Sequence, residues 1–382
     1  MAHHGVAATE NPLSGLWKPN RVENLYYGPD CVQKHLLSSL PNESSKAFII
    51  TGSSLAQKTP LIKSVEQLLG SKHAGTFSSI KQHNPVAQMD EGVALVQKDP
   101  SVDTVISIGG GSPIDAAKVV SYRANEKNGK YLYHIAIPTT LSAGECTMAG
   151  GFTKEDGTKA GVFSPEIAPK TVFYDPVFGK HTPPKLMLGT GLRALDHSME
   201  LMYHPTATEV PCKRMALTAA ADLFTYLPKY QKDPQDEDAI THLLLACFAS
   251  CGFLGLNFAP MGLSHSLGYA LGSPYMIPHG ETSCLTLGHV VKLKAETDSA
   301  AASNIARMMP SIGKARTGDD KADALTVADA ILSLVKNLGF IQKLGEYGVG
   351  EDQVQIITER ATNSKKGDKL YDAVEPLVKG LY

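Results

Sequence analysis

The stretch SIGGGSPIDAAK, residues 107–118, decides how the first half of the chain is interpreted. A hydrophobic run, TVISIGG (104–110), leads into it, and a helical pattern, PIDAAKVVSYRA (113–123), follows. The junction carries three consecutive glycines, Gly109, Gly110 and Gly111. Glycines lack Cβ, so their N–H groups can approach a pyrophosphate closely where the helix dipole favours an anion. The stretch predicts a phosphate-binding loop, and the alternative is a tight strand-to-helix turn.

The residues after the glycines suit the start of a helix. Ser112 is placed at the N-cap, Pro113 at the first helical position, and Asp115 near the third, at the positive end of the helix. The stretch is neither GxGxxG nor GxxxxGK[ST], so the usual dinucleotide fingerprint and the P-loop are both absent.

The first half of the chain alternates strand and helix patterns. KAFIITG (46–52) reads as a strand, PLIKSVEQLLG (60–70) as a helix and YHIAIPTT (133–140) as a third strand. This alternation predicts a parallel sheet with crossover helices. After TPP (182–184) four segments have helical periodicity without strand signals: 186–203, 212–230, 239–258 and 323–340.

We therefore expect an α/β dinucleotide-binding domain over residues 1–182 and an all-helical domain over 183–382. A length of 382 residues suits two domains. In dinucleotide-binding folds an acidic residue after an early strand commonly holds the ribose hydroxyls and repels a 2′-phosphate. Here the strand at 46–52 is followed by Gly52, Ser53 and Ser54 without an acid. This leaves room and hydroxyl donors for NADPH.

Composition excludes several classes of partner. Lys+Arg 36 against Asp+Glu 38 gives a net charge of -2, a field too weak to favour nucleic acid or an anionic membrane surface. No run approaches the ~18 apolar residues of a spanning helix, and the first residues lack the pattern of a secretory signal. The six cysteines form no CxxC pair, and Cys247 and Cys251 read as buried hydrophobes. We expect a cytoplasmic protein that acts on a small molecule.

Three histidines stand out in the helical half: His197 in GLRALDHSMEL, His265 in GLSHSLGYALG and His279 in IPHGETSC. Arg193 precedes His197 by four residues and Tyr269 follows His265 by four, so each pair shares a helix face. Neutral imidazoles suit zinc or ferrous iron, but spacing alone does not show that the three converge.

Taken together, GGGSPIDAAK, AIPTTLSAGECTMAGGFT (136–153) and the two histidine motifs resemble the iron-containing alcohol dehydrogenase family of the dehydroquinate-synthase-like superfamily. The resemblance covers roughly 20–380, and PHGET, GTKAG and VFYDP are similar to motifs of maleylacetate reductases. It implies a dinucleotide domain and a helical metal domain. As a partner we expect a second copy of the chain, in a homodimer. It also implies cofactor contacts from Thr139, Thr140 and Ser142, and from Lys159, whose alternative is an exposed loop lysine.

The resemblance places the family's three histidine ligands on His197, His265 and His279. The family's aspartate ligand falls on Arg193, and a further family histidine falls on Tyr269. An arginine there removes one anionic ligand and adds a cation, so a bound Fe or Zn is doubted. Asp196 lies about 100° around an ideal helix from His197 and is expected to point elsewhere unless the helix turns. Arg193 is expected to bind a substrate anion, or else to pair with Glu200.

The leading function is an NADPH- or NADH-dependent reductase that transfers hydride to a carbonyl or conjugated enone of a small, anionic substrate. Arg193 and a protonated His265 or His279 would polarise the oxygen and supply the proton. One alternative is a metal-dependent alcohol dehydrogenase. Others are a family member that performs elimination, cyclisation or condensation, and a non-catalytic nucleotide-binding protein.

Overall fold

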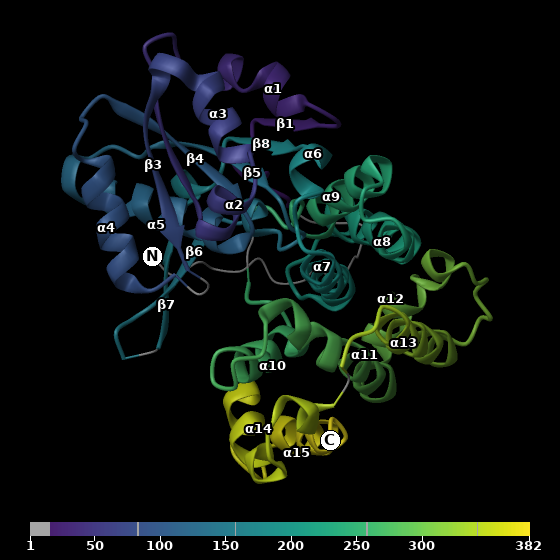
Figure 1. The fold of residues 1–382 in the computed structure, drawn as a ribbon. Coiled ribbons are helices and arrows are strands. Elements are labelled where there is room, and N and C mark those ends of the chain that lie inside the picture. Colours follow the sequence, from purple (N-terminus) through teal and green to yellow (C-terminus); the bar gives the residue numbers. More distant parts are fainter. Residues whose placement is uncertain (1–15, 82–83, 157, 257–258, 342) are drawn as a thin grey trace. The chain divides into compact units, whose positions relative to one another are not determined.

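In the computed structural model, the described residues are 16–81, 84–156, 158–256, 259–341 and 343–382. They form two compact units, each described here by itself (Figure 1). The α/β unit comprises residues 19–183 and also Pro234–Phe248, a segment from the helical half of the sequence. The helical unit comprises 16–18, 184–233 and 249–382.

The α/β unit is built on a six-stranded parallel sheet. Its strands are β1 (Asn24–Tyr27), β2 (Lys46–Gly52), β3 (His73–Ile80), β4 (Val102–Gly109), β5 (Tyr133–Pro138) and β8 (Thr171–Tyr174). They lie in the order β1-β8-β5-β4-β2-β3. The chain leaves β2 towards β3 on one side and then crosses back to β4 on the other. The direction of winding therefore reverses between β2 and β4, where such folds bind their ligands.

Alternating side chains of the strands bury the two faces of the sheet. Ile49 of β2 packs with the helices α1 (Cys31–His35) and α3 (Leu61–Leu69). Its neighbours Phe48 and Ile50 point the other way, into the core formed with α4 (Val86–Val96) and α5 (Gly111–Asn128). This period of two is expected of a strand covered on both faces. The short helices α2 (Ser53–Lys58) and α6 (Pro176–Gly179) follow β2 and β8.

A separate antiparallel hairpin, β6 (Ala149–Thr153) and β7 (Lys159–Phe163), packs against α5. The hairpin was not predicted from the sequence, because its glycine-rich strands carry little hydrophobic alternation. The predicted α/β architecture is otherwise confirmed.

The second half of the chain contains the helices predicted from periodicity and several more. Predicted segments correspond to α7 (Pro184–Tyr203), α8 (Arg214–Lys232), α9 (Glu237–Cys251, mostly in the α/β unit) and α13 (Asp320–Asn337). The others are α10 (Leu263–Gly272), α11 (His279–Thr297), α12 (Ser299–Ala306), α14 (Val354–Thr362) and α15 (Lys369–Lys379). An apolar core joins α10, α11, α14 and α15. None of the described helices is long and apolar enough to span a bilayer, and all six cysteines are free and buried.

Candidate active site

Predicted cofactor residues follow three neighbouring strands of the sheet. Thr51 pairs with Ile108, and Gly109 pairs with Pro138, so β2, β4 and β5 end at the same level. The loops that begin at Gly52, at Gly109 and at Thr139 therefore leave the same edge of the sheet side by side. The structure brings these predicted residues together at the edge where the winding reverses.

The glycine loop begins its helix two residues earlier than the sequence suggested. Helix α5 starts at Gly111, and its N-cap is Gly110 in an extended conformation, with no side chain accepting a capping hydrogen bond. Ser112 therefore lies inside the first turn and is not the cap, which corrects the prediction. Gly109 has φ 137°, a conformation that favours glycine. The uncapped N-terminus leaves main-chain N–H groups suited to a phosphate.

Two hydroxyl groups border the glycine loop. An ideal Cβ on Gly110 would lie 3.1 Å from Thr140 Oγ1, and one on Gly111 would lie 3.8 Å from Ser142 Oγ. The two hydroxyl oxygens are 2.9 Å apart. Thr139 fastens this loop to the sheet, because its N–H donates to the Gly109 carbonyl at 2.9 Å. The donor set of this edge, amide N–H groups with hydroxyls, fits a dinucleotide pyrophosphate.

Asp115 was predicted to lie at the positive end of the helix, but its carboxylate accepts a hydrogen bond from the β6–β7 hairpin instead. Its Oδ2 accepts a hydrogen bond from the Gly151 N–H at 3.2 Å, and Lys118 lies 3.7 Å from its Oδ1. Burial raises the pKa of Asp115, and the nearby cations Lys118 and Lys159 oppose that rise. Lys159 itself is exposed on β7.

Lys118 is a further residue of this region that the sequence analysis did not single out. Its side chain is fully buried, and its Nζ donates to the Gly144 carbonyl at 2.5 Å and to the Ala149 carbonyl at 2.9 Å. These bonds tie α5 to the loop that follows Thr140 and to the hairpin. Its place in the GGGSPIDAAK motif, one helical turn after Asp115, was the signal available.

At the end of β2, Gly52 is followed by Ser53 and Ser54 in the first turn of α2. Both serines are exposed, and neither the N-cap nor the first turn holds an acidic residue. No acidic side chain in this turn opposes the predicted binding of a 2′-phosphate.

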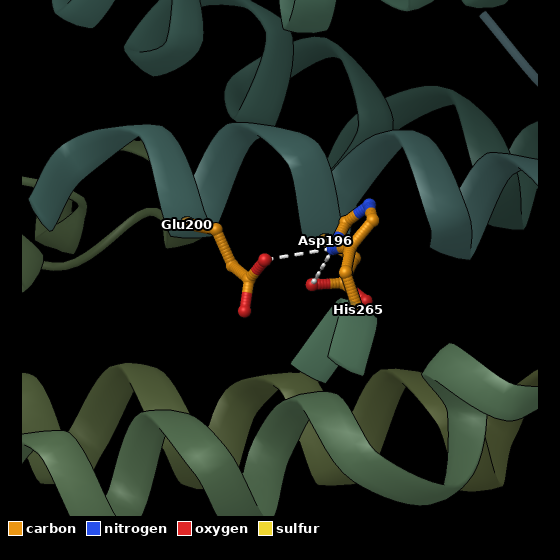
Figure 2. A group of neighbouring side chains, drawn as sticks. All are labelled: Asp196, Glu200 and His265. Carbon is orange, nitrogen blue, oxygen red and sulfur yellow. Dashed lines mark hydrogen bonds and ion pairs between the residues drawn. The ribbon is translucent and has the colours of Figure 1, made fainter. Parts of the chain in front are cut away.

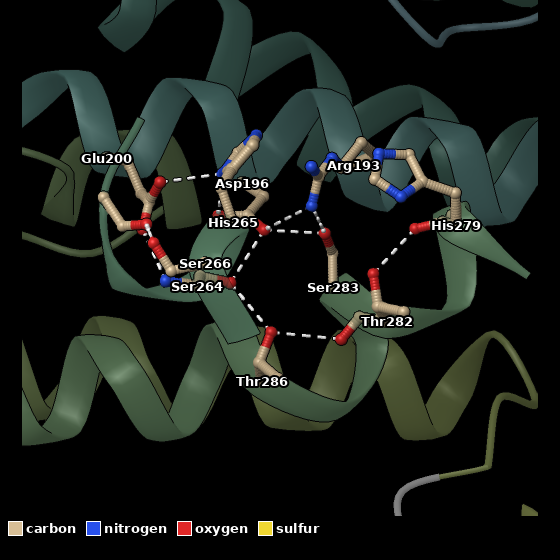
Figure 3. A network of polar contacts seen from close by, with 12 residues as sticks. Arg193, Asp196, Glu200, Ser264, His265, Ser266, His279, Thr282, Ser283 and Thr286 are labelled. Carbon is tan, nitrogen blue, oxygen red and sulfur yellow. Dashed lines mark hydrogen bonds and ion pairs between the residues drawn. The ribbon is translucent and has the colours of Figure 1, made fainter. Parts of the chain in front are cut away.

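The helical unit gathers a buried cluster of ionised and hydroxyl side chains (Figures 2 and 3). Helix α7 supplies Arg193, Asp196 and Glu200 at intervals of three and four residues, which places them along one face. Facing them are Ser264 and His265 from α10 and Ser283 and Thr286 from α11. All seven side chains are buried.

His265 is held by two carboxylates. Its Nδ1 lies 2.7 Å from Glu200 Oε2 and 3.5 Å from Asp196 Oδ1. Burial and Arg193 act to lower the pKa of His265, but the two carboxylates outweigh them, so the pKa is raised. Its Nε2 has no hydrogen-bond partner among the described residues. The two carboxylates therefore favour the protonated imidazole, and its other nitrogen is left without a partner among the described residues.

Arg193 is part of the same cluster. Its Nη1 lies 3.6 Å from Asp196 Oδ2 and donates to Ser283 Oγ at 3.1 Å. Asp196 Oδ2 also accepts hydrogen bonds from Ser283 Oγ at 2.6 Å and Ser264 Oγ at 2.7 Å. Burial raises the pKa of Asp196, but His265 and Arg193 more than offset this and hold it well below its usual range.

Asp196 and Glu200 contact other partners than the sequence predicted. Asp196 was expected to point away from the histidines, yet it lies between Arg193 and His265. The ideal-helix angle was measured from His197, whereas His265 approaches α7 from a neighbouring helix on the Asp196 side. Glu200 was considered as the partner of Arg193, but it bonds to His265 and to the Ser264 N–H at 2.7 Å.

The other predicted site residues differ in burial. His197 is buried, with its ring centroid 4.9 Å from that of His265. Burial, His265 and Arg193 hold the pKa of His197 well below its usual range, so it is neutral. His279 begins α11 and is exposed, and its ring stacks on exposed Tyr269 at 5.9 Å. The structure therefore brings His197 and His265 together and leaves His279 with Tyr269 at the surface.

Helices α7 and α11 touch beside His279. An ideal Cβ on Gly280 would lie 2.8 Å from the carbonyl carbon of Gly189, closer than a real Cβ approaches backbone. The two helices are therefore in backbone contact at the turn that carries His279.

Family profiles match both halves of the chain. The profile of iron-containing alcohol dehydrogenases matches residues 23–176, and that of the C-terminal part of the Fe-containing alcohol dehydrogenase family matches 187–374. The chain belongs to the iron-containing alcohol dehydrogenase family and is an oxidoreductase of that family.

Individual relatives agree with this assignment. Maleylacetate reductase of Sphingobium indicum is 28% identical over 321 residues, which make up 84% of each chain. A 1-propanol dehydrogenase of Citrobacter freundii is 28% identical over 274 residues, 71% of this chain and 73% of that protein. The crystal structure of maleylacetate reductase from Agrobacterium tumefaciens matches with a TM-score of 0.80 at 23% identity, covering 97% of this chain and 98% of that one. The predicted fold is confirmed.

The family implies a metal, and one group of described side chains lies close enough to share an ion. Asp196, Glu200 and His265 each offer a ligand atom within 4.8 Å of the others. The ligand atoms of His197, His265 and His279 do not form such a group among the described residues. The cluster already contains the Arg193 cation, which at ~4 Å and an effective dielectric near 20 repels an ion by about 4 kcal/mol per unit of its charge. Two serine hydroxyls already occupy Asp196 Oδ2 as well. The side chains therefore fit a divalent metal poorly.

Proposed function

We propose that the protein is a nicotinamide-dependent reductase that converts a carbonyl group, or the carbonyl of a conjugated enone, of a small substrate. The observation that carries this proposal is the imidazole of His265: two carboxylates beside its Nδ1 favour the protonated form, and its Nε2 has no hydrogen-bond partner among the described residues. Membership of an oxidoreductase family and the uncapped N-terminus of α5 in the α/β unit support it.

The α/β unit would hold the dinucleotide. The N–H groups at the start of α5, with Thr140 and Ser142, would bind the pyrophosphate, and Ser53 and Ser54 would face the adenosine ribose. When bound, the reduced nicotinamide supplies a hydride at its C4.

The helical unit would supply the proton. His265 Nε2–H would donate to the substrate oxygen as the carbonyl carbon accepts the hydride, so that the carbonyl becomes an alcohol. Proton and hydride together account for the two hydrogens gained. Glu200 orients the ring through Nδ1, and Arg193 holds Asp196, the second carboxylate beside that nitrogen.

The test is a panel of aldehydes, ketones and enones assayed with NADPH and with NADH by loss of nicotinamide absorbance. For any compound turned over, the reaction is repeated with cofactor deuterated at C4. We expect one deuterium on the reduced carbon and none on oxygen. Tight cofactor binding without oxidation by any compound would contradict the proposal and favour a non-redox member or a nucleotide-binding protein.

A further inference from the structure

The cations of helix α7 are each matched by a carboxylate. The side chain of Arg193 is 4% exposed and lies 3.6 Å from Asp196 Oδ2. Lys185, near the start of the same helix, lies 3.2 Å from Glu281 Oε1. These are the two Lys or Arg side chains of α7. Neither presents an uncompensated positive charge to a ligand of the helical unit.

The charge of the buried cluster is at most zero. Arg193 contributes one positive charge, and Asp196 and Glu200 contribute two negative charges (Figure 3). His265 adds one positive charge when protonated and none when neutral. The sum is therefore zero when His265 is protonated and minus one when it is neutral. A substrate carboxylate brought here would lose its hydration without meeting a net positive charge, which is costly in a buried site.

We propose that Asp196 is a specificity-determining residue: by neutralising Arg193 it makes the site accept an uncharged aldehyde or ketone in preference to a carboxylate-bearing substrate. This rests on the proposed reductase function and replaces the expectation, formed from Arg193 alone, of an anionic substrate. This preference distinguishes the chain from its relatives named maleylacetate reductases, whose name states a carboxylate-bearing substrate.

Asp196 holds this role because it is fixed in place. Hydroxyl groups from α10 and α11, Ser264 and Ser283, both donate to the Oδ2 that faces Arg193. The carboxylate therefore cannot turn away from the guanidinium without losing three partners. Glu200 does not pair with Arg193, because its carboxylate accepts hydrogen bonds from His265 and from the Ser264 N–H.

The experiment compares matched substrate pairs on the same enzyme preparation. The pairs are 4-oxopentanoate with its methyl ester and 4-formylbenzoate with its methyl ester, each assayed with NADPH. The quantity measured is the ratio of kcat/KM for the acid to kcat/KM for the ester. Because both substrates meet the same protein, any loss of folded protein cancels. For the unchanged chain we expect the ester to be preferred at least ~10-fold, the factor given by 1.4 kcal/mol.

Two variants should move the ratio in opposite directions. Asp196→Asn keeps an oxygen that accepts the two hydroxyl bonds but frees the charge of Arg193, so the acid-to-ester ratio should rise at least ~10-fold. Arg193→Gln leaves the carboxylates uncompensated, so the ratio should fall. The matched control is Asp323→Asn, which removes another buried, arginine-paired carboxylate, 2.9 Å from Arg316 Nε. The control should leave the ratio unchanged.

The outcomes separate this inference from the function on which it rests. Preference for the acids in the unchanged chain, or an unaltered ratio in both site variants, overturns the role of Asp196 while leaving a carbonyl reductase in place. Absence of turnover with both pairs and with the wider panel overturns the reductase and this inference together.

Discussion

The glycine loop and the buried cluster around His265 both interact with charged groups. The loop does so mainly with main-chain atoms, whereas the cluster does so with side chains. At the edge of the sheet the donors are main-chain N–H groups of Gly110 and its neighbours, assisted by hydroxyls, and the acidic side chain nearby is turned to the hairpin. In the helical unit every group that matters is a side chain, and each ionised one has a partner of opposite sign. A site made of backbone tolerates few changes of shape, whereas a site made of paired side chains is sensitive to any change of charge.

The largest expected effect is in the cluster. His265→Ala removes the proposed proton donor, and general acid catalysis typically contributes 10²–10⁴-fold. We expect kcat to fall by at least ~100-fold, while the Kd for NADPH, measured by its fluorescence, stays within about twofold. A variant that kept its full kcat would show that the proton comes from elsewhere.

The pH profile provides a check on this assignment. The pKa of His265 is raised above its usual range, so the protonated form, and with it the rate of reduction, should persist at low pH and decline as pH rises through that pKa. Glu200→Gln weakens the hold on the proton and should move the decline to lower pH.

Arg193→Asp is expected to convert the cluster around His265 into a metal site. The variant places a third carboxylate beside Asp196, Glu200 and His265 and removes the cation that repels an ion. Zn²⁺ at 100 times its Kd should stabilise it by about 2.7 kcal/mol in thermal unfolding. The unchanged chain should show no such gain, contain little stoichiometric metal, and keep its activity after chelation. One tightly held metal per unchanged chain would instead support the metal-dependent alcohol dehydrogenase.

Gly110→Val probes the backbone-built site. The new side chain would begin 3.1 Å from Thr140 and would project branched methyl groups where the phosphate is expected. We expect the Kd for NADPH to rise by at least ~30-fold, about 2 kcal/mol, with secondary structure by circular dichroism unchanged. Unaltered NADPH binding would reduce the loop to a strand-to-helix turn. Gly129→Ala, at the other end of the same helix, is a control for helix stability, since it lies away from the loop.

The smallest effect concerns the choice of cofactor. Gly52→Asp places a carboxylate at the end of β2, where it would repel a 2′-phosphate and accept hydrogen bonds from the ribose hydroxyls. We expect the preference for NADPH over NADH to fall by roughly tenfold. A strong native preference for NADH, unchanged in the variant, would show that another strand end holds the ribose.

The two regions also differ in how much of their structure could be predicted from the sequence. The glycine loop was predictable because a strand, three glycines and a helix follow one another in a single stretch, and only the cap moved, from Ser112 to Gly110. The cluster was harder, because the direction of Asp196 depends on where α10 places His265. Helical spacing fixes angles about one axis, and it does not say which neighbouring helix lies at which angle. For the same reason helical spacing suggested Arg193 as the partner of Glu200, although Glu200 bonds to His265. Lys118 was missed because its partners, the Gly144 and Ala149 carbonyls, belong to a loop and a hairpin whose approach to α5 the sequence does not reveal.

The backbone contact between Gly189 and Gly280 bears on the thermodynamics of ligand binding. Helices that already touch cannot close further around a ligand, and they cannot part without exposing the packed turn. His279 on α11 and Arg193 on α7 therefore start from a spacing set before any substrate arrives. Adjustment is left to side-chain rotation, which loses less conformational entropy than ordering a segment of backbone. Calorimetry should accordingly find a heat-capacity change on substrate binding no larger than the buried area of the ligand alone requires.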